Sequence, residues 1–573
     1  MRFDLFLPYQ KKPDALRRWL KALGPTWASS PVRRLIQSIC FLVFLVLLFY
    51  VCWPYGSHNY ALHLAAKERI PAESFLALDP LVSLSTAIAA RTWVFSLAWG
   101  GAILAVCLLF PRSFCGYICP LGSLIDLFDW TISKRIDRFR AGRDGWWVHL
   151  KYYLLTAVLI SSCFGILLSG FVAAIPVITR GLQFTLSPLP MGAVKGWYLN
   201  PPMNAGHWFS IGLFLVIFFV GILRPRFWCR YVCPTGAVFS IFNLFRGTER
   251  KVESSCIHCD KCVRICPFDA IKPGDYTTRT ADCTLCQTCA GVCPTHSIKF
   301  VARWETVALK LPGNALPVVP FSRRNLIAGA ISGGVLAAGI HFSSSPSNAI
   351  VRPPGSVPED DFLRLCIRCG ECFKACPNNV LQAAGFSDGF NNLWTPEVVA
   401  NWSGCEPSCN NCGQVCPTAA IRPLPIEEKR VARMGLAVVN EQTCLPHAQR
   451  EACQMCVDEC NAAGYNAIEF RRVGVRLDED ANAIEASGFL APVVLGDKCV
   501  GCGLCQTRCH MINVKQKHLV GRTAIEILAG EGREDRLRSG SYIALRQRRQ
   551  HERSQIKPPQ TQSGNGYLPD FLK

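Results

Sequence analysis

Residues 256–267 read CIHCDKCVRICP, and residues 283–294 repeat the pattern as CTLCQTCAGVCP. Three cysteines spaced by two residues wrap one face of an iron–sulfur cubane, and the fourth, placed before proline, ligates the neighbouring cluster. The spacing therefore predicts two [4Fe–4S] clusters. One uses Cys256, Cys259, Cys262 and Cys293, and the other uses Cys283, Cys286, Cys289 and Cys266. Zinc is the alternative, but zinc sites typically use two separated C-x2-C pairs.

Four more cysteine quartets follow, and we number all six in chain order. The third to sixth are Cys366/Cys369/Cys372/Cys376, Cys405/Cys409/Cys412/Cys416, Cys444/Cys453/Cys456/Cys460 and Cys499/Cys502/Cys505/Cys509. The fourth and fifth quartets have a longer first gap, which inserts a loop without changing the number of ligands. Spacing alone leaves open which of these quartets exchange their last cysteine. The sequence thus predicts six [4Fe–4S] clusters.

The composition supports a metal protein that sits partly in lipid. The chain has 573 residues, 32 cysteines and a formal net charge of +20, and its mean hydropathy is +0.21. Cysteines this closely spaced suit metal sites better than disulfides. Many of the Lys and Arg residues flank apolar segments, a position in which basic residues indicate the orientation of a membrane protein. The net positive charge is therefore explained without nucleic acid, and we expect no nucleic-acid partner.

Four apolar runs, at residues 35–53, 93–110, 152–176 and 208–223, are near the length that crosses a bilayer. Basic residues gather before the first run and between the second and third, which places the N-terminus and both of these flanks in the cytoplasm. Buried core helices of a soluble domain are the alternative. We expect an α-helical four-span membrane bundle, with a possible fifth span, joined to α+β bacterial ferredoxin-like domains.

The four-span region contains an internal duplication. Residues 111–120 read PRSFCGYICP after the second run, and residues 225–234 read PRFWCRYVCP after the fourth. A two-fold arrangement of the two units would bring together four thiols, which we call the motif cysteines: Cys115, Cys119, Cys229 and Cys233. They are candidate ligands of a further metal or cluster. Alternatively, each C-x3-C-P only ends a helix at its proline.

These features divide the chain into successive parts. We expect a cytoplasmic N-terminal segment (1–34), a four-helix membrane domain (35–245), a cytoplasmic two-cluster ferredoxin domain (250–300), a linker (301–321), a fifth apolar segment (322–345), a four-cluster ferredoxin domain (350–515) and a polar basic tail (516–573) that is mobile and without chemistry.

The combination resembles two components of periplasmic nitrate reductase systems in one chain. Residues 33–298 resemble the NapH-type membrane ferredoxin, with four spans, two C-x3-C-P motifs and two quartets. Residues 322–511 resemble the MauM/NapG-type ferredoxin, with an Arg-Arg leader and four quartets. MauN, NosR and CcoG share parts of the pattern. By resemblance to multi-cluster ferredoxin subunits, we expect the third quartet to exchange with the sixth and the fourth with the fifth.

The resemblance also implies that Ser322-Arg323-Arg324 opens a twin-arginine export signal, so that the C-terminal domain is periplasmic. A domain whose clusters assemble on folding has to cross the membrane already folded. The alternative is a basic stop beside a fifth span. Residues 347–349 read Ser-Asn-Ala, a cleavable pattern, so whether the domain stays attached is left open.

These expectations give a function. A chain in the bacterial inner membrane would oxidise membrane quinol, as the quinol dehydrogenase part of a respiratory complex, and pass electrons to a periplasmic cytochrome or reductase. Asp79, in an apolar external loop, could accept a quinol proton, or it could cap the helix that begins at Pro80. The rival functions are an electron-donating maturation or reactivation factor for a periplasmic metalloenzyme, and a redox sensor.

Overall fold

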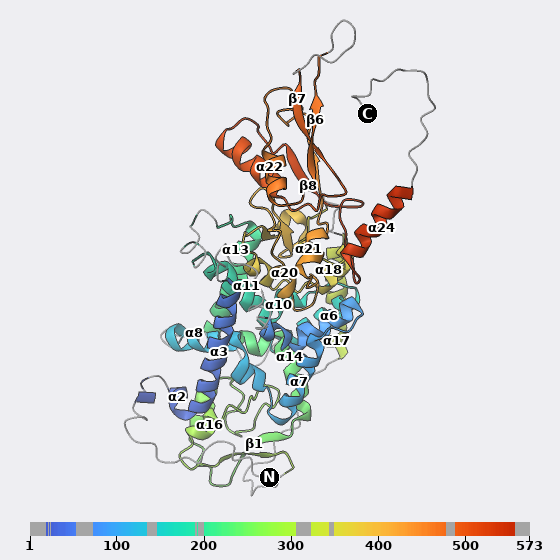
Figure 1. Ribbon diagram of the computed structural model, residues 1–573. Helices are drawn as coiled ribbons and strands as arrows, with labels where there is room; N and C mark the ends of the chain where they lie inside the picture. The colour runs from blue at the N-terminus through green and yellow to red at the C-terminus, as the bar shows by residue number, and fades with distance from the viewer. Residues whose placement is uncertain are drawn as a thin grey trace.

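The computed structural model describes residues 25–52, 73–133, 146–189, 200–304, 323–342, 349–476 and 487–555, together with residues 19, 20, 22, 192 and 197. Much of the N-terminal segment, most of the linker, Ser322 and residues 347–348 of the expected cleavage site lie outside the described residues. Three parts follow one another along the long axis in Figure 1, with one cysteine-rich domain at each end of a helical bundle.

Long helices form the bundle (Figure 1): α3 (Pro31–Cys52), α7 (Ser96–Leu109), α9 (Leu150–Cys163), α13 (Ala205–Phe219) and α17 (Arg323–Phe342). Short helices fill the space between them and the C-terminal domain: α5 (Ser74–Ala77), α6 (Pro80–Ala90), α10 (Ser169–Val172) and α11 (Ala174–Leu186). Among the described residues, Pro31–Tyr50 and Ala205–Ile222 are long and apolar enough to span a bilayer by length and composition, which alone is weak evidence for a membrane.

The prediction of one continuous span over residues 152–176 was wrong. Helix α9 ends at Cys163, and the chain turns through Gly165, whose φ of +81° is left-handed. The apolar residues beyond the turn form α10 and α11, where they are buried against protein. In residues 152–176, the apolar composition therefore indicates burial and does not indicate one continuous helix.

The duplicated unit folds twice in the same way. Helix α7 leads to the π-helical turn η1 (Phe114–Ile118) and helix α8 (Pro120–Phe128), and α13 leads through η5 (Val220–Ile222) to η6 (Trp228–Val232) and α14 (Pro234–Phe242). Each turn closes with a backbone hydrogen bond of 2.8 Å, from Cys119 to Phe114 and from Cys233 to Trp228. Proline is the first residue of the helix that follows, where its missing N–H costs nothing.

A small domain follows the second unit and covers one end of the bundle. Its strands β1 (Thr248–Val252) and β2 (Ile298–Ala302) pair antiparallel, with Thr248 opposite Ala302. The two quartets lie between these strands on loops and on the short helices α15 (Lys261–Ile265) and α16 (Thr288–Gly291). The first and last strands of this domain therefore lie side by side.

The C-terminal domain consists of short helices and three two-stranded sheets: β3 (Leu381–Ala383) with β4 (Pro396–Val398), β5 (Leu436–Val439) with β8 (Ile525–Leu528), and β6 (Ile468–Val473) with β7 (Phe489–Val494), all antiparallel. Its helices are α18 (Glu359–Leu365), α19 (Glu371–Ala375), α20 (Asn411–Gln414), α21 (Ile426–Val431), α22 (Met455–Ala462), α23 (Leu504–Cys509) and α24 (Tyr542–Gln555), with the π-helix η10 (His510–Gln516) after α23.

The expected mobile tail from residue 516 is partly wrong, because residues 516–555 are part of the domain. Strand β8 pairs with β5, and the carboxylate of Glu428 accepts the backbone N–H of Tyr542 at the start of α24, at 2.6 Å. Tyr542 itself is buried. This stretch is polar because α24 lies on the surface of the domain. The apolar residues that anchor it are few and widely spaced, so its composition resembled that of a mobile tail.

Candidate functional site

Cysteines of the first two quartets gather as the spacing indicates. Cys256, Cys259, Cys262 and Cys293 line one hollow between β1 and the loop that follows it. Cys266 interacts electrostatically with Cys283, Cys286 and Cys289 of the other set. The last cysteine of each quartet therefore lies with the first three of its neighbour, which is the arrangement that two-cluster ferredoxin spacing requires.

The regularly spaced quartets share a local backbone shape. In the first quartet, His258 and Asp260 have φ values of 55° and 56°, and in the third, Arg368 and Gly370 have φ values of 55° and 85°. Left-handed residues at these two positions turn the chain around a centre, so that successive thiols face inward. The fourth quartet lacks this shape, and Asn410, before its α20, has a φ of −131°.

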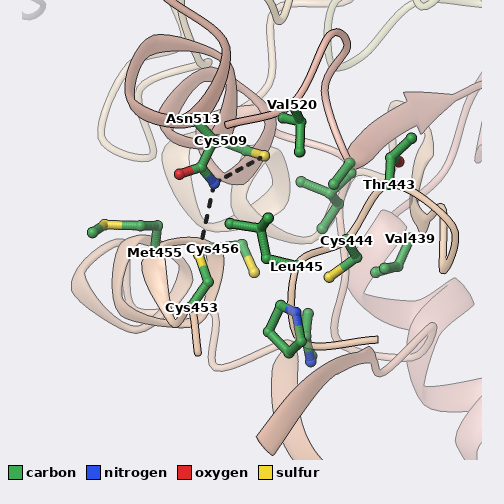
Figure 2. Close-up of a pocket in the computed structure, with 14 residues that line it drawn as sticks. Val439, Thr443, Cys444, Leu445, Cys453, Met455, Cys456, Cys509, Asn513 and Val520 are labelled. Carbon is green, nitrogen blue, oxygen red and sulfur yellow. Dashed lines mark hydrogen bonds between the residues drawn. The ribbon is translucent and has the colours of Figure 1, made fainter. Parts of the chain in front are cut away.

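The expected exchange in the C-terminal domain was wrong. Figure 2 shows Cys444, Cys453 and Cys456 of the fifth quartet around a hollow shared with Cys509 of the sixth. The side-chain amide of Asn513 reaches the sulfur atoms of both Cys453, at 3.6 Å, and Cys509, at 3.7 Å.

The other C-terminal cysteines complete this pattern. Cys460 lies with Cys502 and Cys505, Cys416 with Cys366 and Cys369, and Cys376 with Cys405 and Cys409. The third quartet thus exchanges with the fourth, and the fifth with the sixth. Neighbouring quartets exchange because their short helices pack together, α19 on α20 and α22 on α23.

The four C-terminal sets form a line. The backbone N–H of Cys405 donates to the carbonyl of Cys502 at 2.7 Å, which joins the two exchanged pairs. The set that contains Cys369 is nearest the bundle, because Cys369 belongs to the same buried core as Leu167 of the bundle. The set of Figure 2 lies at the far end, beside β5.

These thiols fit a cubane better than a single ion. Within the described part of the chain, no three His, Cys, Asp or Glu side chains converge closely enough to hold one metal ion. Ligands of a four-iron core stand further apart than ligands of one zinc, because the core lies between them. Backbone N–H groups also donate to thiols, from Ala270 to Cys266 at 3.3 Å and from Ala467 to Cys460 at 3.3 Å, as is usual around metal-bound sulfur.

The motif cysteines come together in the bundle. Cys119 interacts electrostatically with Cys115, Cys229 and Cys233. They lie on η1 and η6 and at the starts of α8 and α14, so the duplicated turn positions all four. Burial raises the pKa of the Cys229 thiol to about 11, although Arg226 and Arg112 act against the shift.

Buried arginines bind the two units to each other. Arg226, fully enclosed, donates to the carbonyls of Cys115, at 3.0 Å, and Gly122, at 3.2 Å, in the opposite unit. The equivalent residue of the first unit is Arg112. The backbone is left-handed at both positions, with a φ of 52° at Arg226 and 49° at Arg112. Arg112 in turn lies beside Gly236 of the second unit. The sequence alone did not single out this pair of arginines, although Pro-Arg is repeated before each motif.

Asp126 neutralises part of this charge. Its carboxylate accepts from Arg226 at 2.6 and 2.8 Å, from Arg34 at 2.8 Å and from Arg33 at 3.0 Å. Burial alone would raise the pKa of Asp126, but the three guanidinium groups hold it well below the usual range. The equivalent residue of the second unit is Ser240, which carries no charge.

The second unit has no acidic residue at the position of Asp126, and the small domain supplies a carboxylate there instead. Asp282, next to the second quartet, lies 3.1 Å from Lys151, 3.5 Å from Arg112 and 3.7 Å from Arg230. Burial raises the pKa of Asp282, yet these cations hold it at about 2. The domain is thereby bound to the bundle beside the motif cysteines.

A second contact places the second quartet directly beside the first motif. The hydroxyl of Tyr117 donates to the carbonyl of Leu285 at 3.1 Å, and Thr284 lies against Gly116. Leu285 and Thr284 both lie between Cys283 and Cys286 of the second quartet.

Asp79 caps a helix and is not exposed. Its carboxylate accepts from the N–H groups of Leu81, at 3.0 Å, and Val82, at 3.4 Å, at the start of α6, and from the hydroxyl of Thr235 at 3.2 Å. The loop predicted to lie at the external interface instead enters the bundle, where its apolar residues are buried. The structure therefore favours the capping interpretation over a quinol proton acceptor.

Known proteins share these features. A family model described as a 4Fe-4S binding domain matches twice, at residues 92–138 and 206–252, which are the two copies of the duplicated unit. A second model with the same description matches residues 250–272 and 363–382. The methylamine utilization ferredoxin-type protein MauM of Methylorubrum extorquens is 33% identical over 228 residues, 38% of this chain and 93% of that protein.

The chain belongs to the MauM/NapG family of ferredoxin-type proteins. The ferredoxin-type protein NapG of Escherichia coli is 34% identical over 186 residues, 31% of this chain and 76% of NapG. NapF of the same organism is 30% identical over 171 residues, 30% of this chain and 85% of NapF. No solved structure matches the chain. As a member of this family, the protein is an iron–sulfur electron-transfer protein with several [4Fe–4S] clusters.

Proposed function

We propose that this MauM/NapG-family protein is a membrane-bound relay that takes electrons from membrane quinol and passes them through [4Fe–4S] clusters to a periplasmic cytochrome or reductase. The observation that carries the proposal is the order of the thiols. The second quartet adjoins the motif cysteines, and the four C-terminal sets continue in a line away from the bundle. A line of one-electron centres suits transfer over a distance.

The surface of the bundle supports a place in the membrane. On α17, Gly329 and Gly333 are buried against α9, and Ala337 is buried against Ile166, just beyond the end of α9. Ile331, by contrast, is 61% exposed and Val335 is 65% exposed. Small residues at the interface and large apolar residues outside are typical of helices that pack within lipid. Large apolar side chains are exposed in the same way on α3, α7 and α13.

The packing of α17 also supports a retained fifth span. An ideal Cβ at Gly333 would lie 2.8 Å from the carbonyl oxygen of Ala157, and one at Gly329 would lie 2.9 Å from the Cβ of Thr156. So close an approach at two positions one turn apart is typical of tightly packed helices. We propose that the C-terminal domain stays attached through this helix after export, in the periplasm, with the N-terminus in the cytoplasm.

We also propose that the motif cysteines hold a further metal or cluster. They lie together beside Arg112 and Arg226, with Cys119 and Cys233 buried, and the neighbouring carboxylates are already shared among several cations. A thiolate-bound metal group would supply negative charge where buried cations exceed buried carboxylates. The position between the two batches of quartets suits a connecting centre.

Iron analysis and reduction test the proposal. The protein purified anaerobically from membranes should contain at least about twenty-four iron atoms per chain, four for each of six cubanes, plus any iron that the motif cysteines hold. A reduced quinol analogue should then bleach the cluster absorbance. Iron far below this number, or clusters that no quinol reduces, would refute the relay. A partner enzyme that becomes active only after co-expression with this chain would instead favour the maturation function.

A further inference from the structure

An open pocket lies where the C-terminal domain meets the bundle. Its space, including open solvent at the mouth, is about 670 Å³. One wall comes from the end of α11 and the start of α13, with Gln183 and His207, and the other from α19 and β3, with Phe373 and Gln382. The ring of His207 lies on Phe184, with ring centroids 4.4 Å apart. An open pocket lined by apolar groups with a few polar ones is typical of a small-molecule site.

Two amides in this pocket have an unused polar atom. Gln183 is only 5% exposed, and its Oε1 has no hydrogen-bond partner in the described structure. The Nε2 of Gln382 is likewise buried without a partner among the described residues. Buried polar groups are normally paired, so each of these amides can offer one polar atom to a ligand once its side chain turns toward the pocket. A ring that carries hydroxyl or carbonyl oxygens would satisfy both an acceptor and a donor.

Charge at the pocket favours a neutral ligand. Lys374 lies beside it, but its ammonium group is paired with the carboxylate of Glu371 at 2.7 Å, and both side chains are buried. A phosphate or another charged group would therefore find no unpaired charge of opposite sign on this lysine. The walls are otherwise made of aromatic, proline and aliphatic side chains and neutral polar groups.

The pocket shares a wall with the third quartet. The Oε1 of Gln183 lies so close to Gly370 that a side chain at this position would collide with it. Gly370 directly follows Cys369, and Phe373 directly follows Cys372. A molecule in the pocket would therefore lie beside the set of thiols nearest the bundle.

The pocket also lies at one end of a candidate span. Helix α13 begins at Ala205 and continues into the apolar stretch that is long enough to cross a bilayer. Trp208 is 62% exposed in its first turn, and Phe209 beside it is also exposed. Exposed aromatic side chains at the end of a span are typical of the membrane interface, the depth at which a lipid-soluble ring could enter.

We propose that this pocket binds the ring of a membrane quinol, with Gln183 accepting a hydrogen bond from one hydroxyl and Gln382 donating to the oxygen of the other. The ligand class rests on the proposed function. Oxidation of one quinol to quinone releases two electrons and two protons. The electrons pass one at a time to the [4Fe–4S] clusters as oxidants, first at the third quartet, and the protons leave to water at the mouth.

Photolabelling tests the site without relying on turnover. The full chain, purified anaerobically with its clusters, is irradiated with an azidoquinone, and the labelled peptides are identified by mass spectrometry. We expect labels in residues 183–207 or 373–383, which excess decylubiquinone suppresses. Gln183→Leu should weaken competition by decylubiquinol about tenfold, because only the reduced ring donates to Oε1. Gln382→Leu should weaken binding of either form about tenfold, the loss of about one hydrogen bond. Gln547→Leu, on the exposed face of α24, is the matched control and should bind normally.

The outcomes separate the two proposals. Labels that map to other residues, such as those around Asp79, would overturn this pocket but leave quinol oxidation standing. No suppressible label anywhere on the chain would overturn both. Iron content and visible spectrum show whether each variant is folded, and if a variant loses iron, the peptide map of the unaltered protein still decides.

Discussion

Asp126 gives the sharpest test of how the bundle is built. Its side chain is 4% exposed and forms ion pairs with Arg33, Arg34 and Arg226. Asp126→Asn keeps the shape but leaves three guanidinium groups without their common counter-charge. Breaking a buried pair by removing one partner costs about 3–5 kcal/mol. At about 2–4 °C for each kcal/mol, the melting temperature of the bundle should fall by roughly 6–20 °C.

The assay is thermal unfolding in detergent, followed by tryptophan fluorescence. Asp275→Asn is the matched control, because that side chain is exposed and bonds only within its own turn, so it should melt as the unaltered protein does. Adding Arg226→Gln to Asp126→Asn removes one unpaired charge and should recover part of the loss. A melting temperature for Asp126→Asn within about 2 °C of the unaltered protein would show that this network does not hold the units together.

The same carboxylate predicts a pH dependence. Because the pKa of Asp126 is lower in the folded bundle than its ordinary value of 3.8, its contribution to stability is fully present above that value. It is lost only as the pH falls towards the lower folded pKa. Acid titration of the melting temperature should therefore show less acid sensitivity in Asp126→Asn than in the unaltered protein.

Three further substitutions test the contacts between parts. Gly170→Ala places a Cβ against a carbonyl of the C-terminal domain and should loosen its docking, seen as faster limited proteolysis, whereas Gly212→Ala meets open space and should not. Gly333→Leu should separate α17 from α9 and lower the melting temperature, whereas Gly334→Leu, one residue further on and in open space, should leave it unchanged. Cys293→Ser should remove about four iron atoms per chain, one cubane, and an unchanged iron content would contradict Cys293 as a cluster ligand.

Local spacing was enough to identify the cysteine chemistry. Three cysteines within seven residues constrain a short backbone segment directly, so the gathering of Cys256, Cys259 and Cys262 follows from the chain itself. The family resemblance to MauM and NapG rested on the same local motifs and was confirmed. The exchange in the C-terminal domain was misjudged, because the partner of Cys509 depends on how α22 packs against α23.

Apolar runs were a weaker guide. Residues 152–176 looked like one span, but the turn at Gly165 divides them, because hydropathy does not distinguish a residue that faces lipid from one that faces another helix. The loop of Asp79 was expected at an interface for the same reason. The structure instead favours the other interpretation that the sequence offered, in which Asp79 caps the helix that begins at Pro80.

By itself, the sequence determined the cysteine quartets, the duplicated unit and the family, because each depends on residues close together in the chain. Only the tertiary structure decided which distant groups meet: Asp126 with Arg226, Asp282 with Arg112, the four motif cysteines with one another, and the two walls of the pocket that contain Gln183 and Gln382. Such contacts join residues far apart along the chain, and they form because buried charges and polar atoms have to find partners when helices pack.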